Sequence, residues 1–319
     1  MNPSVSVIIP TYNWSSVLPY SIGSVLRQTF TDFELLVVGD GCTDDSEAVV
    51  GRVGDPRVEW INLPTNTGHQ SEPNNEGLRQ ARGQFIAYLG HDDLWLPHHL
   101  SCLISALEQG ADLAYGISLI LLGEPNGYHR RPYPPCEGYQ PGMWIPPTSV
   151  VHRRSVTDHI GGWRHYRELD TDPEVELWRR AYTAHYRFVF VPRLTAVKFP
   201  ASTRRDVYKI RPCHEQAAWS QRIQNEDNFE IAELIRTILV MGAELRPKPI
   251  DFAKIASMAP YRVLLHDFLE ETRKRLMRRG RRLISRPARS KGDATDAAPE
   301  PKGNVIEVAR EFKGLPRMP

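Results

Sequence analysis

Residues 5–13 read Val-Ser-Val-Ile-Ile-Pro-Thr-Tyr-Asn, and the sequence around them repeats the same kind of pattern. The run Val5–Ile9 is mostly β-branched and apolar, which is typical of a strand that is buried on both faces. Pro10 cannot donate a hydrogen bond to a neighbouring strand, so we expect the strand to end there. The sequence therefore predicts a central strand that carries Thr11-Tyr12-Asn13 at its carboxyl end.

Strand and helix patterns alternate from this first strand to about residue 115. Apolar runs at 34–38, 58–61 and 85–89 predict three further strands. The expected helices are 15–27, one from about Ser46, one that ends near Arg82-Gly83, and one with Pro97 in its first turn. Such alternation is typical of a parallel sheet covered by helices, so we expect a doubly wound α/β fold.

Beyond residue 115 the composition and the expected secondary structure change. Prolines and glycines crowd 116–147, which favours irregular or hairpin-like structure. A helix is expected at 174–184, a strand at 188–191, and mostly helices beyond Asp206. Three C-terminal segments complete the plan: a basic amphipathic stretch at 263–286, a disordered linker at 287–303 and a short helix at 305–312.

Composition narrows the class of protein. The chain has 319 residues, and 40 Lys+Arg against 38 Asp+Glu leave a net charge of +2, so no dedicated nucleic-acid binder is expected. The four cysteines lie far apart, which predicts neither a disulfide framework nor a zinc site and favours a reducing compartment. The start of the chain lacks the pattern of a signal peptide, and no apolar run approaches ~18 residues. We expect a cytoplasmic protein whose membrane contact, if any, is peripheral.

Loops at the carboxyl ends of parallel strands are where an open α/β sheet binds ligands. Here they are 10–13, 39–45 and 90–93, all rich in small, polar and acidic residues, which favours a site for a nucleotide and a metal ion. The first strand is not followed by Gly-x-Gly-x-x-Gly, which argues against a dinucleotide-binding domain, and no Gly-x-x-x-x-Gly-Lys-[Ser/Thr] is present, which excludes a P-loop NTPase.

Several ordered motifs together resemble one family. They are residues 5–13, Ser24-Val25-Leu26-Arg27-Gln28-Thr29, residues 33–44 with Gly39-Asp40-Gly41, Asn66-Thr67-Gly68, Asn75-Glu76-Gly77-Leu78, Ala81-Arg82-Gly83 and Tyr88-Leu89-Gly90-His91-Asp92-Asp93, with weaker echoes at Gly161-Gly162-Trp163 and 174–179. Over about the first 180 residues the sequence is similar to glycosyltransferase family 2 of the GT-A fold. The resemblance implies inverting transfer of a sugar from a nucleotide-sugar, commonly UDP-linked, to an acceptor hydroxyl with Mn²⁺ or Mg²⁺ as cofactor.

The resemblance also implies where the nucleotide would bind. Pro10, Thr11, Tyr12 and Asn13 would line the base pocket, with Tyr12 against the ring, and Asp40 would accept a hydrogen bond from the base. Two positions depart from the family pattern: Gly39 stands where a second acid is common, and Asn74 where an arginine facing the nucleotide is frequent.

For the diphosphate, the resemblance assigns Asp92 as the direct metal ligand. Asp93 would contact the metal or the sugar, and His91 would supplement the site with an imidazole, which Mn²⁺ accepts better than Mg²⁺. Gly90 stands where the family usually has the first aspartate of its metal motif. One carboxylate is enough where phosphates and water complete the coordination.

The general base maps to Glu174, with Asp172 as a competitor, and Trp163 would line the acceptor side. Each candidate also has a purely structural alternative: a turn for Asp40, a helix cap for Asp92 and Asp93, a complement to the helix dipole for Asp172 and Glu174, and a core position for Trp163.

The expected organisation is a GT-A domain at 1–205, with a nucleotide-binding half (1–115) and an acceptor-side half (116–205), a helical extension at 206–286, and 287–319 as linker and terminal helix. The acceptor would be a glycan, a lipid-linked molecule or another hydroxyl compound. The 263–286 stretch has three interpretations: a solvated helix face, a peripheral contact with anionic lipid, or, more weakly, an RNA contact. Two rival functions stay open: a catalytically reduced nucleotide-sugar-binding protein, and a sugar-nucleotide pyrophosphorylase, which would need a Gly-rich basic loop after the first strand.

Overall fold

The computed structural model of the chain describes residues 2–123, 130–133, 138–244 and 313–315. The chain divides into two compact units, 1–241 with 303–319 and 242–302, and the fold below is that of the first. The basic stretch at 263–286, the linker at 287–303 and the helix at 305–312 that the sequence predicts lie outside the described residues. Within the described part, no helix combines the length and the apolar character needed to cross a bilayer.

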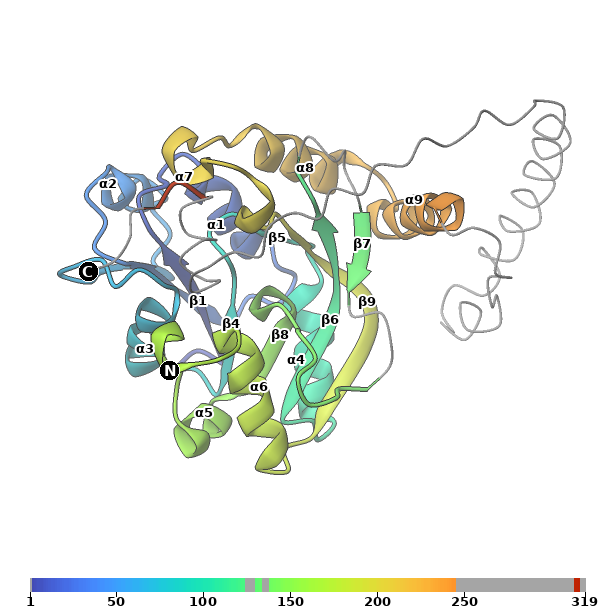
Figure 1. The fold of residues 1–319 in the computed structure, drawn as a ribbon, viewed down its shortest axis with the longest axis horizontal. Helices are drawn as coiled ribbons and strands as arrows, with labels where there is room; N and C mark the ends of the chain where they lie inside the picture. Colours follow the sequence, from blue (N-terminus) through green and yellow to red (C-terminus); the bar gives the residue numbers. More distant parts are fainter. Residues whose placement is uncertain (1, 124–129, 134–137, 245–312, 316–319) are drawn as a thin grey trace, which may run out of the picture. The chain divides into compact units, whose positions relative to one another are not determined.

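Four parallel strands form the first half of the sheet, at the positions that the sequence predicts. They are β1 (Val5–Thr11), β2 (Phe33–Gly39), β3 (Val58–Asn62) and β4 (Phe85–Tyr88), in the spatial order β3-β2-β1-β4. The helices between and after them are α1 (Leu18–Leu26), α2 (Ser46–Gly51), α3 (Ser71–Gln80) and α4 (His99–Glu108). Figure 1 shows the sheet running between helices on its two sides, so the predicted doubly wound α/β class is confirmed.

The second half extends the same sheet with mixed strands. These are β5 (Leu94–Trp95), β6 (Leu113–Leu121), β7 (Arg130–Tyr133), β8 (Val150–Arg153) and β9 (Phe188–Lys198). From β4 the order continues β8-β6-β9-β5, with β7 on β6; β8 is antiparallel to β4 and β6, whereas β9 is parallel to β6. Within 116–147, where irregular or hairpin-like structure is expected, β6 continues to Leu121 and pairs antiparallel with β7, as in a hairpin. β9 runs seven residues beyond the predicted Val191. Pairing between β6 and β9 outweighs the local Gly and Pro signals.

The remaining helices are α5 (Arg154–Ile160), α6 (Pro173–Thr183), α7 (Val207–Ile210), α8 (His214–Asn225) and α9 (Phe229–Glu244). The helix expected at 174–184 is thus present, and the region after Asp206 is helical as far as it is described.

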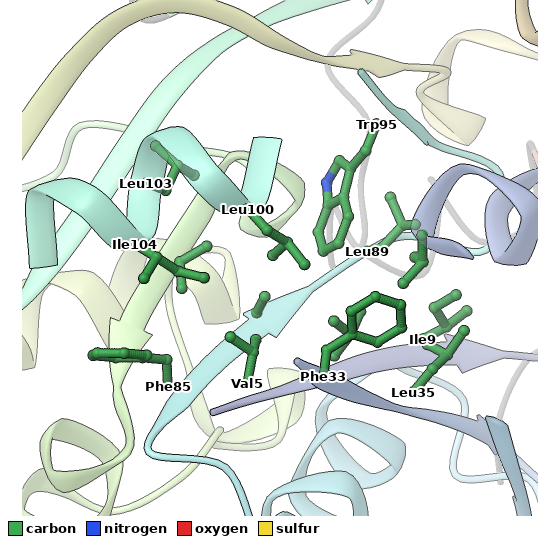
Figure 2. Close-up of a cluster of buried hydrophobic side chains, with 14 of the residues drawn as sticks. Val5, Ile9, Phe33, Leu35, Phe85, Leu89, Trp95, Leu100, Leu103 and Ile104 are labelled. Carbon is green, nitrogen blue, oxygen red and sulfur yellow. The ribbon is translucent and has the colours of Figure 1, made fainter. Parts of the chain in front are cut away.

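Two apolar clusters, one on each face of the sheet, hold the unit together. Alternation along β1 sends Val5, Val7 and Ile9 into one cluster and Ile8 into the other. Figure 2 shows the first cluster, where Leu100 and Ile104 of α4 face the strand side chains. Full burial of such side chains stabilises the fold by about 1.5–3 kcal/mol each. The core thereby fixes β1 between β2 and β4, which determines where the loops after these strands emerge.

Candidate active site

The loops after β1, β2 and β4 emerge at one edge of the sheet. Gly39 of β2 is in register with Thr11 of β1, and Tyr88 of β4 is in register with Ile8. Adjacent strands lie ~4.8 Å apart, so the chains leading into Asp40 and Asp92 are separated by about 10 Å, with β1 between them. The topology therefore brings the predicted base-binding and metal-binding residues to the same edge.

The β1 loop is fastened to the β2 loop by Asn13. Asn13 has a left-handed backbone (φ 48°), and its Oδ1 accepts hydrogen bonds from the N–H groups of Thr43 (2.7 Å) and Asp44 (3.1 Å). Its Nδ2 donates to Thr43 Oγ1 (3.1 Å). Of the predicted base-pocket residues Pro10, Thr11, Tyr12 and Asn13, the side chain of Tyr12 is half-buried and the other three are buried. Asn13 therefore holds the two loops together. Tyr12 is the one of these four residues that is partly exposed to solvent.

Asp40 organises the next loop. Its Oδ1 accepts from the backbone N–H (2.9 Å) and hydroxyl (2.7 Å) of Thr67, and its Oδ2 accepts from Gly68 N–H (3.0 Å) and Asn66 Nδ2 (3.1 Å). Four donors fill the usual acceptor capacity of a carboxylate. A hydrogen bond from a base would therefore have to share an oxygen that already holds the 66–68 turn.

Removal of this carboxylate should loosen the turn. In Asp40→Ala the N–H groups of Thr67 and Gly68 lose their acceptor, so we expect unfolding free energy to fall by about 2–3 kcal/mol. Urea denaturation of the purified variant measures this loss. A change below about 0.5 kcal/mol, the range of ordinary surface substitutions, would contradict the structural role of Asp40.

Packing explains why Gly39 departs from the family pattern. A Cβ at this position would lie 2.4 Å from Asn62 Oδ1 and 2.8 Å from the ring of Trp60. Asn62 is itself engaged, because its Oδ1 accepts from Cys42 N–H at 2.9 Å and its Nδ2 donates to the Cys42 carbonyl at 3.0 Å. An acidic side chain at Gly39 would displace Asn62 and break its two hydrogen bonds to Cys42.

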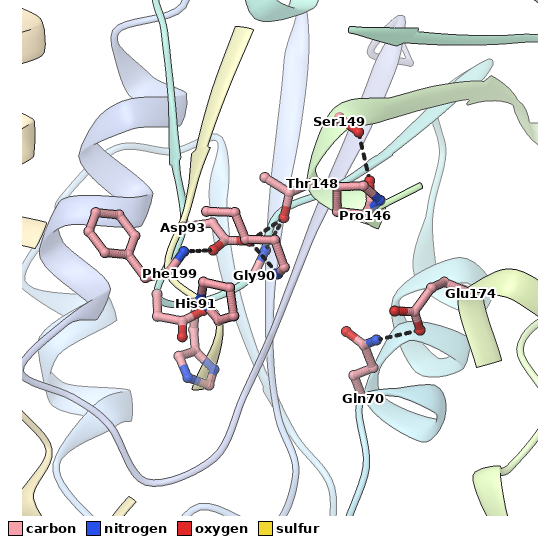
Figure 3. Close-up of polar contacts among 12 residues, drawn as sticks. Gln70, Gly90, His91, Asp93, Pro146, Thr148, Ser149, Glu174 and Phe199 are labelled. Carbon is pink, nitrogen blue, oxygen red and sulfur yellow. Dashed lines mark hydrogen bonds and ion pairs between the residues drawn. The ribbon is translucent and has the colours of Figure 1, made fainter. Parts of the chain in front are cut away.

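Asp93 is buried and paired within the chain. Its carboxylate accepts from the Thr148 hydroxyl, from Phe199 N–H (3.0 Å) and from Lys198 Nζ (3.0 Å), and it is completely shielded from solvent. Figure 3 shows Asp93 among Gly90, Thr148 and Phe199. These donors leave Asp93 poorly placed to be a metal ligand.

Asp92 contrasts with its neighbour. The residue retains 9% exposure, and the side-chain hydrogen bond that reaches it, from Gln216 Nε2 (3.3 Å), goes to its backbone carbonyl and not to its carboxylate. Burial, reinforced by the charge of Asp93, raises the pKa of the Asp92 carboxyl. Of the two acids, Asp92 is the one whose oxygens are available to a cation.

His91 faces the β1 loop. Its Nδ1 lies 3.2 Å from the carbonyl oxygen of Pro10, so that nitrogen donates the hydrogen bond. Nε2 is buried and has no hydrogen-bond partner among the described residues. The ring packs against Trp14, with centroids 5.1 Å apart.

The side chains at this edge could bind a metal ion only if phosphate groups supplied some of its ligands. No group of three or more His, Cys, Asp or Glu side chains able to hold a metal occurs among the described residues. Asp92 supplies one carboxylate, which fits Mg²⁺ or Mn²⁺ taking its other ligands from a diphosphate and water. Gly90 cannot readily become the missing acid, because a Cβ there would lie 2.7 Å from Asp93 Oδ2 and 3.3 Å from Asp92 Oδ1.

The two candidate bases differ in their surroundings. Asp172 is exposed at the N-cap of α6 and makes no capping hydrogen bond through its side chain. Glu174 is half-buried; its Oε1 accepts from Trp144 Nε1 (2.9 Å) and its Oε2 from Gln70 Nε2 (3.5 Å), the latter contact drawn in Figure 3. Burial raises the pKa of Glu174, and the Trp144 hydrogen bond opposes the rise. Of the two carboxylates, Glu174 is the one held in place by side chains from elsewhere in the fold.

Two further predicted positions lie inside the protein. Asn74 is completely buried in α3, and neither atom of its amide has a hydrogen-bond partner among the described residues. Trp163 is 4% exposed and packs edge-on against Tyr88, with ring centroids 5.2 Å apart. Trp163 thus occupies the core position that was its structural alternative.

Sequence reasoning missed the partners of the acids: Lys198 and Thr148 on Asp93, and Trp144 and Gln70 on Glu174. Lys198 ends β9, and the apolar run that predicted this strand stops at Val191, so no local signal marked it.

A cavity of about 540 Å³ lies elsewhere, between α3 and α5. Its lining includes Asn75, Arg79, Arg154 and Trp163 and none of the acids at positions 40, 92, 93, 172 or 174.

Comparison with known proteins places the chain in a family. A protein-family model described as Glycosyl transferase family 2 matches residues 6–168. The chain is 35% identical over 123 residues to a Campylobacter jejuni GalNAc(5)-diNAcBac-PP-undecaprenol beta-1,3-glucosyltransferase, covering 37% of this chain and 39% of that protein. It is 35% identical over 113 residues to the Escherichia coli UDP-Glc:alpha-D-GlcNAc-diphosphoundecaprenol beta-1,3-glucosyltransferase WfgD, covering 35% of this chain and 44% of the relative. The matches thus span about two fifths of these relatives.

Solved structures show the same fold. The mannosyltransferase PcManGT from Pyrobaculum calidifontis, in complex with GDP-Man and Mn²⁺, superimposes with a TM-score of 0.50 at 16% identity, covering 83% of each chain. The topology of the sheet, the helices in the C-terminal part of the chain and the family match over residues 6–168 all indicate the same fold. The chain belongs to glycosyl transferase family 2, with the GT-A fold.

Proposed function

We propose that this protein is an inverting glycosyltransferase that takes a sugar from a nucleotide-sugar, UDP-linked by preference. The observation that carries the proposal is the arrangement at the sheet edge. Asp92, in the loop after β4, adjoins Asp93, whose carboxylate pairs with Lys198 Nζ at 3.0 Å, and Glu174 in the first turn of α6 also acts on the charge of Lys198. In this proposal Asp92 would hold a cation, and Glu174, a half-buried carboxylate whose pKa burial raises, would border the same site. The Escherichia coli relative, whose name specifies UDP-Glc, supports the choice of donor.

The proposed chemistry is a single displacement. Glu174 accepts the proton of an acceptor hydroxyl while the hydroxyl oxygen forms a bond to the anomeric carbon. The bond from that carbon to the diphosphate oxygen breaks, and the nucleoside diphosphate leaves with the electron pair. Asp92 would hold Mn²⁺ or Mg²⁺, which when bound neutralises charge on the diphosphate. Attack from the side opposite the leaving group inverts the anomeric centre.

A lipid-linked glycan is the proposed acceptor. Both curated relatives named above carry an undecaprenol diphosphate in their names. The 263–286 stretch, which lies outside the described residues, contains Arg278, Arg279, Arg281 and Arg282 beside apolar positions, a composition suited to peripheral contact with anionic lipid at the cytoplasmic face of a membrane.

The rival function is a nucleotide-sugar-binding protein without transfer. Gly39 and Gly90 favour it, because each replaces an acid that the family pattern usually contains. Transfer or donor hydrolysis separates the rival from the proposal.

The proposed function predicts selective stabilisation by a donor. We expect one of a panel of UDP-, GDP-, CDP- and dTDP-sugars, with Mn²⁺, to raise the thermal midpoint of the chain. Ligand at a hundred times its Kd adds about 2.7 kcal/mol to stability. The stabilising donor should then release its nucleoside diphosphate in the presence of an acceptor. Stabilisation without release would favour the binding protein, and no stabilisation by any donor would refute both.

A further inference from the structure

We propose that Lys198 binds the diphosphate of the donor and stabilises it as it leaves. Lys198 is the last residue of β9, so its backbone is fixed by pairing with β6. The inference rests on the proposed function and adds a residue that neither the motifs nor the comparisons assign.

The ammonium of Lys198 lies among acids. Nζ is 3.0 Å from Asp93 Oδ2, and the charge of Lys198 acts on Asp92, Asp93 and Glu174 together. The charge of Lys198 acts on both Asp92 and Glu174. Its contact with Asp93 places it beside the residue that follows the acid proposed to hold the cation.

Pairing with Asp93 does not exhaust the donors of Lys198. An ammonium has three N–H groups, and the hydrogen bond to Asp93 uses one of them. The side chain also keeps 20% exposure, while that of Asp93 has none. Part of the side chain is thus open to solvent, and in our proposal the remaining donors bind a ligand at this edge of the sheet.

The charges around Lys198 indicate a role for its remaining N–H donors. Three carboxylates act on a single ammonium here, so a diphosphate entering the site meets an excess of negative charge. Asp93 also accepts from Thr148 and Phe199, and these bonds remain when Lys198 turns one N–H toward a phosphate oxygen. When the anomeric carbon–oxygen bond breaks, the electron pair moves to the diphosphate, where a fixed ammonium stabilises the developing charge.

The Gly90 departure fits this role. Removal of an acid from the motif lowers the negative charge near Asp92 and Asp93, so Lys198 is less completely neutralised than it would be beside a third motif acid. Lys198 would then supply part of the positive charge that a metal ion supplies in the family pattern.

The test measures nucleotide binding in EDTA, so that Lys198 is probed apart from any metal. UDP and GDP are titrated into the full chain, with UMP and GMP as controls that lack the second phosphate. In Lys198→Met we expect the preferred diphosphate to bind about 10- to 100-fold more weakly, and its monophosphate less than about 3-fold more weakly. Lys198→Arg, which keeps the charge, should retain most of the affinity.

A matched variant separates this role from neutralisation of Asp93. Lys198→Met combined with Asp93→Asn removes the buried pair together, so if Lys198 only balances Asp93, the double variant should bind diphosphate like the wild type. That result, or equal losses for diphosphate and monophosphate in Lys198→Met, would overturn the inference. Wild-type chain that binds none of the nucleotides, with Mn²⁺ or with EDTA, would instead refute the proposed function.

Discussion

Glu174→Gln should lower the rate of sugar transfer by about 10²–10⁴-fold, the usual contribution of a positioned general base. Glutamine keeps the size of the side chain and can still accept the hydrogen bond from Trp144, so the fold and the donor site should be preserved. We therefore expect the Kd for the donor to change little. The measurement is kcat with a saturating donor, together with donor affinity by calorimetry.

Asp172→Asn is the matched control, because Asp172 lies two residues earlier and is exposed. It should keep most of the activity. The pH profile adds a second check: the base works as a carboxylate, and burial raises the pKa of Glu174, so the acidic limb of kcat should lie above the ordinary glutamate range. Activity that survives in Glu174→Gln but disappears in Asp172→Asn would transfer the role to Asp172.

Asp92→Asn should remove the effect of Mn²⁺ on nucleoside diphosphate binding. The substitution keeps the shape of the side chain but removes the charge that would hold the cation. In wild-type chain we expect Mn²⁺ to tighten diphosphate binding, and in Asp92→Asn we expect affinities with Mn²⁺ and with EDTA to agree within about 3-fold. Loss of this charge stabilisation should lower kcat/KM by about 10²–10³-fold.

Asp158→Asn removes an equal charge from the surface of α5, where the side chain is 64% exposed, and should leave both quantities unchanged. If Mn²⁺ still strengthens diphosphate binding to Asp92→Asn, the cation is held by other groups, and the role proposed for Asp92 fails.

The sequence was informative wherever local pattern and burial coincide. Val5–Ile9 and the runs at 34–38 and 85–89 are buried on both faces of a parallel sheet, so their composition alone marked them as strands. The run at 58–61 forms the edge strand β3, which is only partly buried. Parallel topology then dictated that Asp40 and Asp92 emerge at one edge. This part of the site follows from the order of the elements.

The other part depends on tertiary contacts that no local pattern encodes. β8 is a four-residue strand that exists because β4 and β6 flank it, and β9 extends to Lys198 because β6 pairs with it beyond a bulge. The distinction between Asp92 and Asp93, adjacent in sequence, arises from Thr148, Lys198 and Phe199, which are 55 to 106 residues away. Likewise, the polar neighbours that distinguish Glu174 from Asp172 are distant in sequence.

A crystal structure of the chain with UDP and Mn²⁺ tests most directly whether the sheet edge is the donor site. We expect the diphosphate to lie beside Asp92 and Lys198, with the uracil ring near Tyr12 and the position of the sugar facing Glu174. A diphosphate bound instead in the cavity between α3 and α5, against Arg79 and Arg154, would contradict this expectation.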